Sequence, residues 1–198
     1  MTGGAAGIAR QDITLGLLAG GRATRLGGRD KAWLERGGQA QVLRLSQRFG
    51  AEAGAVLVSA NRDLPRYAQA GLATIADRID GAGPLGGLDA LASACRTPWL
   101  LTLPVDLVDG NDCLVRSLVA AAGDSGVAAQ DDSGLQPLVA LWRVEALRTA
   151  LAAALDQGAL AVRALQARMG MGTVRFAGVR FGNLNTPDDL RAAGIDPP

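Results

Sequence analysis

Short apolar runs alternate with longer amphipathic segments along this chain of 198 residues. An uninterrupted short apolar run is typical of a buried strand, and apolar residues three and four positions apart are typical of a helix. The pattern predicts strands at 13–19, 55–60, 72–76, 99–105, 126–130 and 138–142, with one or two more within 172–185. It predicts helices at 42–49, 87–94, 113–122, 144–155 and 187–194.

The alternation of strands and helices predicts an α/β fold with a mainly parallel central sheet. The length fits a single domain at 13–198 that follows a flexible N-terminal leader at 1–12. In open parallel sheets, ligands bind at the carboxyl ends of the strands, near the point where the strand order reverses. We therefore expect the functional residues in the loops that follow Ala19, Ala60, Ala76 and Val105.

The composition removes several classes of chemistry. Histidine is absent, which excludes Ser-His and Cys-His nucleophiles and histidine-bound metals. The two cysteines form no CxxC pair and the leader has no long apolar core, so neither a zinc knuckle nor a secretory signal is expected. The net charge of +1 and the lack of an apolar run of about 18 residues give no reason to expect nucleic acid or membrane partners. A cytoplasmic location is the resulting expectation.

The segment LAGGRATRLGGRDK (18–31) follows the first expected strand and contains two glycine pairs. Glycines allow the backbone to approach a ligand closely, and loops of this kind turn their N–H groups toward phosphate. The spacing matches neither GxGxxG nor the P-loop GxxxxGK[ST]. The segment ends on Lys31, the single lysine among 20 basic residues. Arg25 and Lys31 are therefore candidate phosphate ligands, one as a planar fork and the other as a compact charge.

Carboxylates follow two of the other expected strands. Asp106 ends an apolar strand, where it can hold Mg²⁺ against nucleotide phosphates, and Asp109 is a candidate for a second metal ligand. Asp77 follows the strand at 72–76 and could accept from a nucleobase edge or a ribose. Asp80 lies close enough in the chain to compete with Asp77 for that role.

The string NLNTPDDL (183–190) precedes and begins the last expected helix. Thr186 as the N-cap and Pro187 at the first helical position explain half of this string structurally. Asn183 and Asn185 are not needed for capping, so their amides are available to a second substrate or to the surroundings of a metal.

The glycine loop resembles the LxGGxxxRMGxxDK signature of the molybdenum cofactor guanylyltransferases, which are nucleotidyltransferases with a Rossmann-like, three-layer fold. The glycines, Arg25 and Lys31 fall in register, and Leu26 replaces the usual methionine. Similar segments follow in the order expected for the family: SANRD (59–63), GPLGG (83–87), the stretch around Asp106, GLQPLVALW (134–142) and NLNTPDDL. The resemblance spans roughly residues 13–191.

The resemblance implies transfer of GMP from GTP to the terminal phosphate of molybdopterin, with release of pyrophosphate and formation of the guanine dinucleotide cofactor. Lys31 would bind the α-phosphate, and Arg25 with the backbone amides of 19–21 would bind the departing phosphates. Asp106 would hold Mg²⁺, which makes Lys31, Arg25 and Asp106 the catalytic set. Asn183 and Asn185 would contact the acceptor. The nucleotide-binding residues would be Leu18, Ala19, Gly20, Gly21, Lys31, Asn61, Asp77 and Asp106.

Several alternatives stay open at this point. The sequence LAGG favours GTP, because related cytidylyltransferases show LAAG, but a cytidylyltransferase or a sugar-phosphate nucleotidyltransferase of the same fold would share the loop. The stretch after Asp106 lacks the usual Thr-Pro-Phe, and Gln136 replaces a common histidine, so a catalytically silent relative that binds nucleotide or cofactor is a further alternative. Beyond the two substrates, transient contact with molybdopterin-carrying or molybdoenzyme-maturation proteins is expected.

Overall fold

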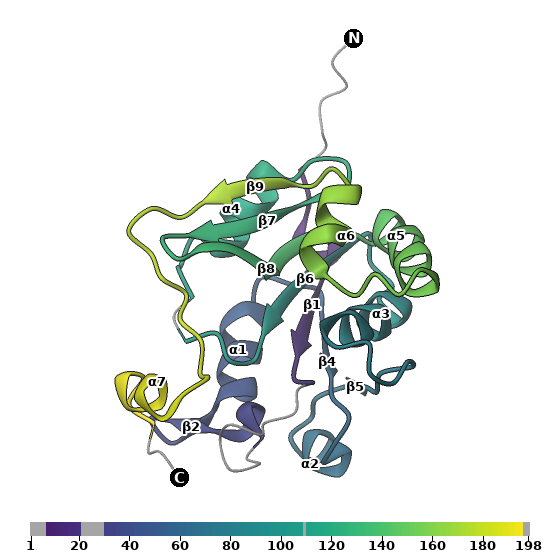
Figure 1. The fold of residues 1–198 in the computed structure, drawn as a ribbon. Coiled ribbons are helices and arrows are strands. Elements are labelled where there is room, and N and C mark those ends of the chain that lie inside the picture. The colour runs from purple at the N-terminus through teal and green to yellow at the C-terminus, as the bar shows by residue number, and fades with distance from the viewer. Residues whose placement is uncertain (1–6, 21–29, 109, 196–198) are drawn as a thin grey trace.

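The computed structural model describes residues 7–20, 30–108 and 110–195. Its central sheet has seven strands in the order β5-β4-β1-β6-β8-β7-β9 (Figure 1). The strands are β1 (Ile13–Leu18), β4 (Ala55–Ser59), β5 (Thr74–Ile75), β6 (Trp99–Pro104), β7 (Gly126–Asp131), β8 (Gly134–Arg143) and β9 (Gly172–Arg175). Each of the strands expected between 13 and 142 is present, although β5 is shorter and β8 longer than the apolar pattern indicated.

The strand directions confirm a mainly parallel sheet. β1 pairs in parallel with β4 and β6, β4 with β5, and β7 with β9, whereas β8 runs antiparallel to β6 and β7. The next two strands of this sheet, β4 and β5, lie on one side of β1, and β6 lies on the other side. The strand order therefore reverses at β1, which predicts a binding crevice at the carboxyl ends of β1 and β6.

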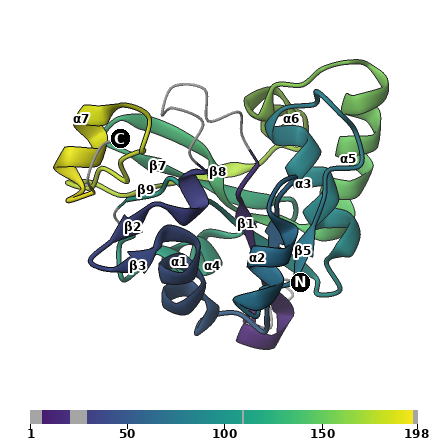
Figure 2. The ribbon, with the colours of Figure 1, turned by 90° about the horizontal axis from the view of Figure 1, so that it is seen from below.

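Helices cover both faces of the sheet, as expected for three layers (Figure 2). One face carries α1 (Gln41–Gly50) and α4 (Leu114–Ala121), and the other carries α3 (Pro84–Ala94), α5 (Val144–Asp156) and α6 (Val162–Arg168). Because successive side chains of a strand point to opposite faces, a central strand between two helical layers buries the side chains of both faces. This explains why β1 is buried at every position.

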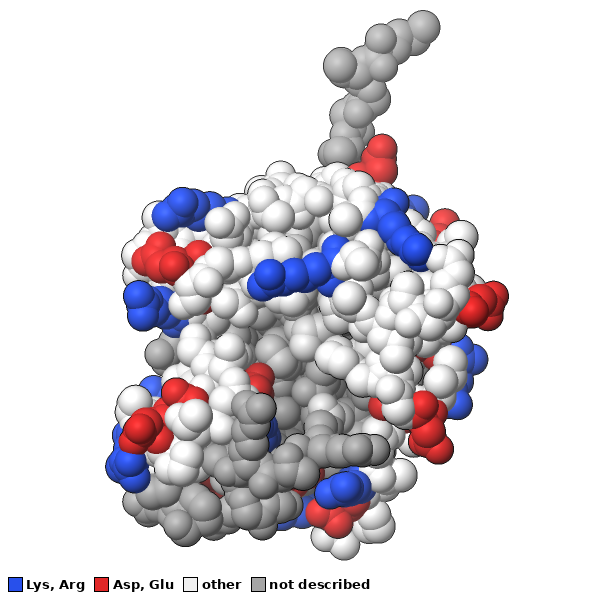
Figure 3. Space-filling view, in the orientation of Figure 1, with Lys and Arg blue, Asp and Glu red and all other residues white. Residues whose placement is uncertain are grey.

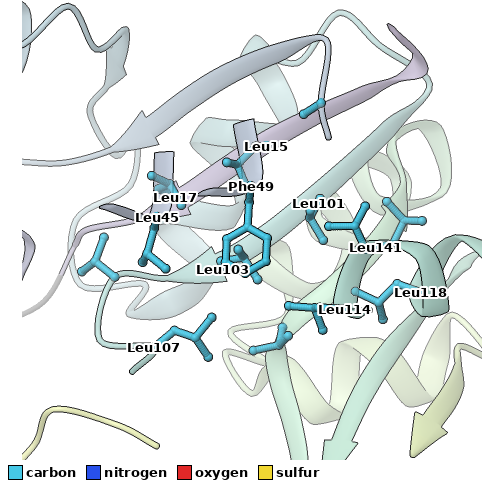
Figure 4. Packing of buried hydrophobic residues seen from close by; sticks show 14 of the residues in the cluster. Leu15, Leu17, Leu45, Phe49, Leu101, Leu103, Leu107, Leu114, Leu118 and Leu141 are labelled. Carbon is cyan, nitrogen blue, oxygen red and sulfur yellow. The ribbon is translucent and has the colours of Figure 1, made fainter. Parts of the chain in front are cut away.

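The two faces of β1 illustrate how the layers pack. Leu15 and Leu17 lie in the cluster that includes Leu45 and Phe49 of α1 (Figure 4). Gly16, between them, faces α3, where a Cβ would lie 2.9 Å from a methyl group of Leu91. The glycine thus lets α3 pack directly on the sheet.

Several short elements were not expected from the sequence. A hairpin of β2 (Glu35–Arg36) and β3 (Gln39–Ala40) turns through two glycines with positive φ, and α2 (Leu64–Gln69) precedes β5.

Two of the expected helices differ by more than one residue from their expected bounds. α3 begins at Pro84, three residues before the apolar pattern indicated, because glycines hide the helical period there. α7 (Pro187–Ala192) packs with Leu34 and Val108 in a separate small apolar cluster.

Residues 8–12, in the described part of the leader expected at 1–12, contact the rest of the domain. Arg10–Asp12 form a short 3₁₀ helix, and the Arg10 guanidinium donates to the Ala53 carbonyl oxygen at 3.0 Å. Ile8 packs against the core. The local sequence could not reveal this, because the partner of Arg10 is 43 residues away.

The surface of the described part mixes charges of both signs. On the face shown in Figure 3, basic and acidic side chains are interspersed rather than gathered by sign. None of the helices in the described ranges is both long and apolar enough to cross a membrane.

Candidate active site

The carboxyl ends of β1, β4 and β6 lie side by side because their parallel pairing is in register. Leu18, the last residue of β1, pairs with Ser59 of β4 and with Pro104 of β6. One further backbone hydrogen bond on each side continues this pairing beyond the strand ends. Three of the predicted site residues follow directly and share this edge of the sheet: Gly20, Asn61 and Asp106.

Three predicted site residues from distant parts of the chain meet at this edge. The Lys31 ammonium donates to Asp106 Oδ2 at 3.0 Å and to Asn185 Oδ1 at 2.5 Å. The side chains of Lys31 and Asp106 are 24% and 19% exposed, so a ligand can reach them. A carboxylate oxygen and an amide oxygen therefore converge on the Lys31 ammonium, and oxygens of these two kinds are the ligands that Mg²⁺ prefers.

Lys31 is held in place by the residue before it. Asp30 is the N-cap of a short 3₁₀ helix (Lys31–Trp33), and its Oδ1 accepts from the Ala32 N–H at 2.9 Å. Its Oδ2 accepts from the hydroxyl of the buried Tyr67 at 3.4 Å. Burial and the adjacent Asp30 charge raise the pKa of Tyr67, so the phenol remains a donor. Sequence analysis assigned no role to Asp30, although an aspartate at the start of a turn is a known capping signal.

Asn185 reaches Lys31 because the segment 181–185 runs alongside 106–108. Backbone hydrogen bonds and a β-bridge between Leu107 and Asn183 join the two segments. The metal candidate and the acceptor candidates are therefore neighbours, although some 80 positions separate them in the chain. Asn183 itself is exposed on this segment.

A capping box fixes the end of the same segment. The Thr186 hydroxyl accepts from the Asp189 N–H at 3.1 Å, which confirms Thr186 as the N-cap of α7. Asp189 Oδ2 accepts from the N–H groups of Thr186 (2.8 Å) and Asn185 (3.0 Å). The Thr186 hydroxyl, these two N–H groups and the charge of Lys31 together lower the pKa of Asp189 against the opposing effect of burial. The ionised Asp189 thus orients the backbone of Asn185.

A second polar cluster lies beside Gly20. Ser59 Oγ donates to Asp77 Oδ1 at 3.1 Å, and Asn61 Oδ1 accepts from the Asp77 N–H at 2.8 Å. A Cβ at Gly20 would lie within 4.0 Å of side-chain atoms of all three residues. Asp80 is exposed in the turn before α3 and takes no part in these contacts among the described residues.

Asp131 is a buried carboxylate that sequence analysis missed. It accepts from Ser133 N (2.8 Å), Gln136 Nε2 (3.1 Å) and Phe181 N (2.9 Å). Burial alone would raise the pKa of Asp131, but these donors outweigh it and lower the pKa. Gln136, which replaces a histidine common in the family, donates to this internal carboxylate. Asp131 thereby ties the start of the segment 181–185 to the turn between β7 and β8.

The remaining candidates are Gly21, Arg25 and Asp109, which lie outside the described residues. Within the described ranges, no three side chains of the types His, Cys, Asp and Glu gather to form a metal cluster. Among the described residues, the side-chain oxygens in contact with Lys31 are those of the Asp106 carboxylate and the Asn185 amide.

Comparison with known proteins identifies the family of the chain. Residues 16–171 match the MobA-like NTP transferase domain. The chain is 34% identical to a molybdenum cofactor guanylyltransferase of Cupriavidus necator, over 93% of this chain and 97% of that protein. It is also 34% identical to a protein of the same name from Yersinia pseudotuberculosis, over 90% and 93% of the two chains.

Solved structures show the same fold at lower identity. Molybdopterin-guanine dinucleotide biosynthesis protein A from Archaeoglobus fulgidus superposes with a TM-score of 0.70 at 20% identity, covering 91% of this chain and 96% of its own. The 2-C-methyl-D-erythritol 4-phosphate cytidylyltransferase from Thermus thermophilus gives 0.68 at 20% identity, covering 90% and 96%. The fold is thus shared by nucleotidyltransferases, and the chain itself belongs to the MobA-like NTP transferase family.

Proposed function

We propose that the chain transfers GMP from GTP to the terminal phosphate of molybdopterin, releasing pyrophosphate and forming the guanine dinucleotide cofactor. The observation that carries this proposal is the convergence of Lys31, Asp106 and Asn185 at the carboxyl ends of β1 and β6. This is the edge at which open α/β sheets bind nucleotides. The guanylyltransferase names of relatives that are 34% identical support the choice of substrates.

Mg²⁺ is the metal that these residues would hold. Asp106 and Asn185 present a carboxylate and an amide oxygen to one cation, and Mg²⁺ is usually bound by few protein oxygens together with phosphates and water. The oxygen ligands present therefore fit the ion. Bound there, Mg²⁺ would orient the triphosphate and neutralise the charge that develops on it.

Lys31 acts on the phosphate at which the bond breaks. The Lys31 ammonium contacts Asp106 and Asn185 in the structure. We infer that the side chain moves to contact the α-phosphate when nucleotide and metal bind. Arg25 and the amides of 19–21 complete the phosphate contacts in this proposal, with the arginine fork on the departing groups. A compact ammonium on the α-phosphate stabilises the charge of the transition state.

The acceptor needs alignment rather than deprotonation. A phosphate monoester is already anionic near neutral pH, so it can attack the α-phosphate without a strong general base, which suits a chain that contains no histidine. Bringing two anions together is the main cost, and positioning plus charge neutralisation meets it. Asn183 and Asn185 would contact the acceptor in this scheme, and their position on the segment beside Asp106 supports this role.

The direct test measures pyrophosphate release with molybdopterin and Mg²⁺, comparing GTP with CTP in the wild type and in Lys31→Ala. Release with GTP that is lost in the variant is the expected result. Preference for CTP would assign the chain to the cytidylyltransferases instead. Nucleotide binding without release in the wild type would favour a silent binding protein.

The cellular setting belongs to the same proposal. We place the reaction in the cytoplasm, with transient contact to proteins that carry molybdopterin or mature molybdoenzymes. A pull-down with the chain as bait, with and without molybdopterin, would test these contacts.

A further inference from the structure

Ser59 is a fully buried polar residue at the carboxyl end of β4. Buried hydroxyls are hydrogen-bonded in folded proteins, and that of Ser59 donates to Asp77 Oδ1 at 3.1 Å. The Asp77 backbone is fixed as well, because its N–H donates to Asn61 Oδ1 at 2.8 Å. Ser59 and Asn61, at the end of β4, thus restrain one carboxylate oxygen and the backbone of Asp77, which follows β5.

The other carboxylate oxygen, Asp77 Oδ2, lies near Gly20. A Cβ at Gly20 would lie 4.0 Å from Asp77 Oδ2 and 3.8 Å from Asn61 Nδ2. Gly20 is exposed, so a ligand can occupy the space beside it. An acceptor oxygen and a donor amide therefore stand next to each other at this point.

Two glycines of α3 close the space behind this pair. A Cβ at Gly87 would lie 2.7 Å from Ser59 Oγ, and a Cβ at Gly86 would lie 3.0 Å from Asp77 Oδ2. Both glycines are buried. The helix therefore packs so closely that the Ser59 hydroxyl and the Asp77 carboxylate have little freedom to rotate.

We propose that Ser59 is a positioning residue for base selection, which holds Asp77 so that Oδ2 accepts from the exocyclic amino group of guanine. The inference rests on the proposed function, because it takes GTP as the nucleotide. Guanine carries an amino group that hypoxanthine lacks, and its O6 acceptor can pair with the Asn61 amide. A site built to bind an N–H group discriminates against an analogue without it, because the acceptor oxygen that the bound base covers is then left unpaired.

The test compares the dissociation constants of GTP and inosine triphosphate (ITP) by calorimetry in the presence of Mg²⁺. We expect the wild type to prefer GTP by about tenfold, the effect of one charge-assisted hydrogen bond. In Ser59→Ala the carboxylate can rotate, so this preference should fall at least about threefold while ITP affinity changes little. The GTP to ITP ratio is the readout that a merely structural role of Ser59 would not change.

Two further variants keep the test independent of folding. Gly86→Ala keeps the Ser59 hydroxyl and places a methyl group 3.0 Å from Asp77 Oδ2, so the GTP to ITP ratio should fall in this variant as well. Thr14→Val removes an equally buried hydroxyl, bonded to Thr97 at the opposite end of β1, and should leave the ratio unchanged.

The possible failures are distinct from one another. Equal loss of GTP and ITP affinity in Ser59→Ala, or a wild type that does not distinguish the two nucleotides, would overturn the inference. The proposed function fails on a separate measurement, namely absence of pyrophosphate release from GTP and molybdopterin by the wild type. GMP transfer without GTP preference over ITP would leave the function standing and remove the role of Ser59.

Discussion

Replacing Lys31 by methionine is expected to tighten metal binding in the absence of nucleotide. In the resting site the Lys31 ammonium contacts Asp106 Oδ2 at 3.0 Å, and this carboxylate is the proposed metal ligand. Methionine keeps an unbranched side chain of similar length and removes the charge. A divalent ion therefore meets a free carboxylate in the variant and a neutralised carboxylate in the wild type.

The size of the effect follows from Coulomb's law. An ion about 2.1 Å from Asp106 Oδ2 would lie no more than about 5 Å from the Lys31 nitrogen, given the 3.0 Å contact. Repulsion between charges of +2 and +1 at this separation is about 1.7 kcal/mol in a water-like dielectric. The water-like value is used because both side chains are partly exposed to solvent. This energy corresponds to binding about 15-fold tighter in Lys31→Met.

The assay counts free Mn²⁺, as a substitute for Mg²⁺, by electron paramagnetic resonance at low ionic strength without nucleotide. Arg48→Met is the matched control, because it removes an exposed cation paired with Asp112 rather than with the site. With GTP present the difference in Mn²⁺ affinity between Lys31→Met and the wild type should become smaller, since Lys31 then neutralises phosphate instead of Asp106. Equal or weaker Mn²⁺ affinity in Lys31→Met would refute the idea that lysine and metal share one oxygen.

Three further predictions concern stability. Thr186→Ala should cost about 1 kcal/mol and speed amide exchange in α7, because the N-cap is lost; unchanged exchange would contradict the role of the cap. Asp131→Asn should destabilise the fold at pH 7. Because the folded pKa of Asp131 is lowered, its stabilisation is present above the unfolded pKa of about 3.9 and is lost as the pH falls through the folded pKa. Urea titrations from pH 7 to pH 3 should therefore show that the difference in unfolding free energy between wild type and Asp131→Asn becomes smaller. A difference independent of pH would contradict this account. Leu101→Ala, in the core, should lower the unfolding free energy by about 2–5 kcal/mol, and a loss no larger than that of an exposed Leu64→Ala would be inconsistent with its burial.

The short elements show where sequence reasoning reached its limit. β2 and β3 have two residues each and α2 has six, so none of the three is long enough to display a period against its background. The apolar pattern is a sum over a window, and elements shorter than the window leave no distinct signal. β8 began earlier than expected because Gln136 and Pro137 interrupt its apolar pattern.

The candidate site divides in a similar way. Asp106 and Asp77 could be selected because each follows a strand, where parallel sheets gather their functional residues. Lys31 stood out as the single lysine, at the end of the glycine loop, and Asn61 was implied by the family resemblance. Ser59 and Asp131 could not be selected, because a buried hydroxyl or carboxylate is defined by its partners. Those partners lie on other elements, at Asp77 for the first and at Phe181 for the second.

The sequence by itself determined the α/β class, the mainly parallel sheet and the edge at which the site lies. These properties follow from local patterns, since apolar runs, helical spacing and glycine loops are readable within a few residues. Only the tertiary structure decided that Asn185 reaches Lys31, that Asp77 rather than Asp80 joins Ser59, and that Gln136 turns inward to Asp131. The physical reason is that a hydrogen bond acts over about 3 Å in space, whereas its two partners here stand 5 to 154 positions apart in the chain.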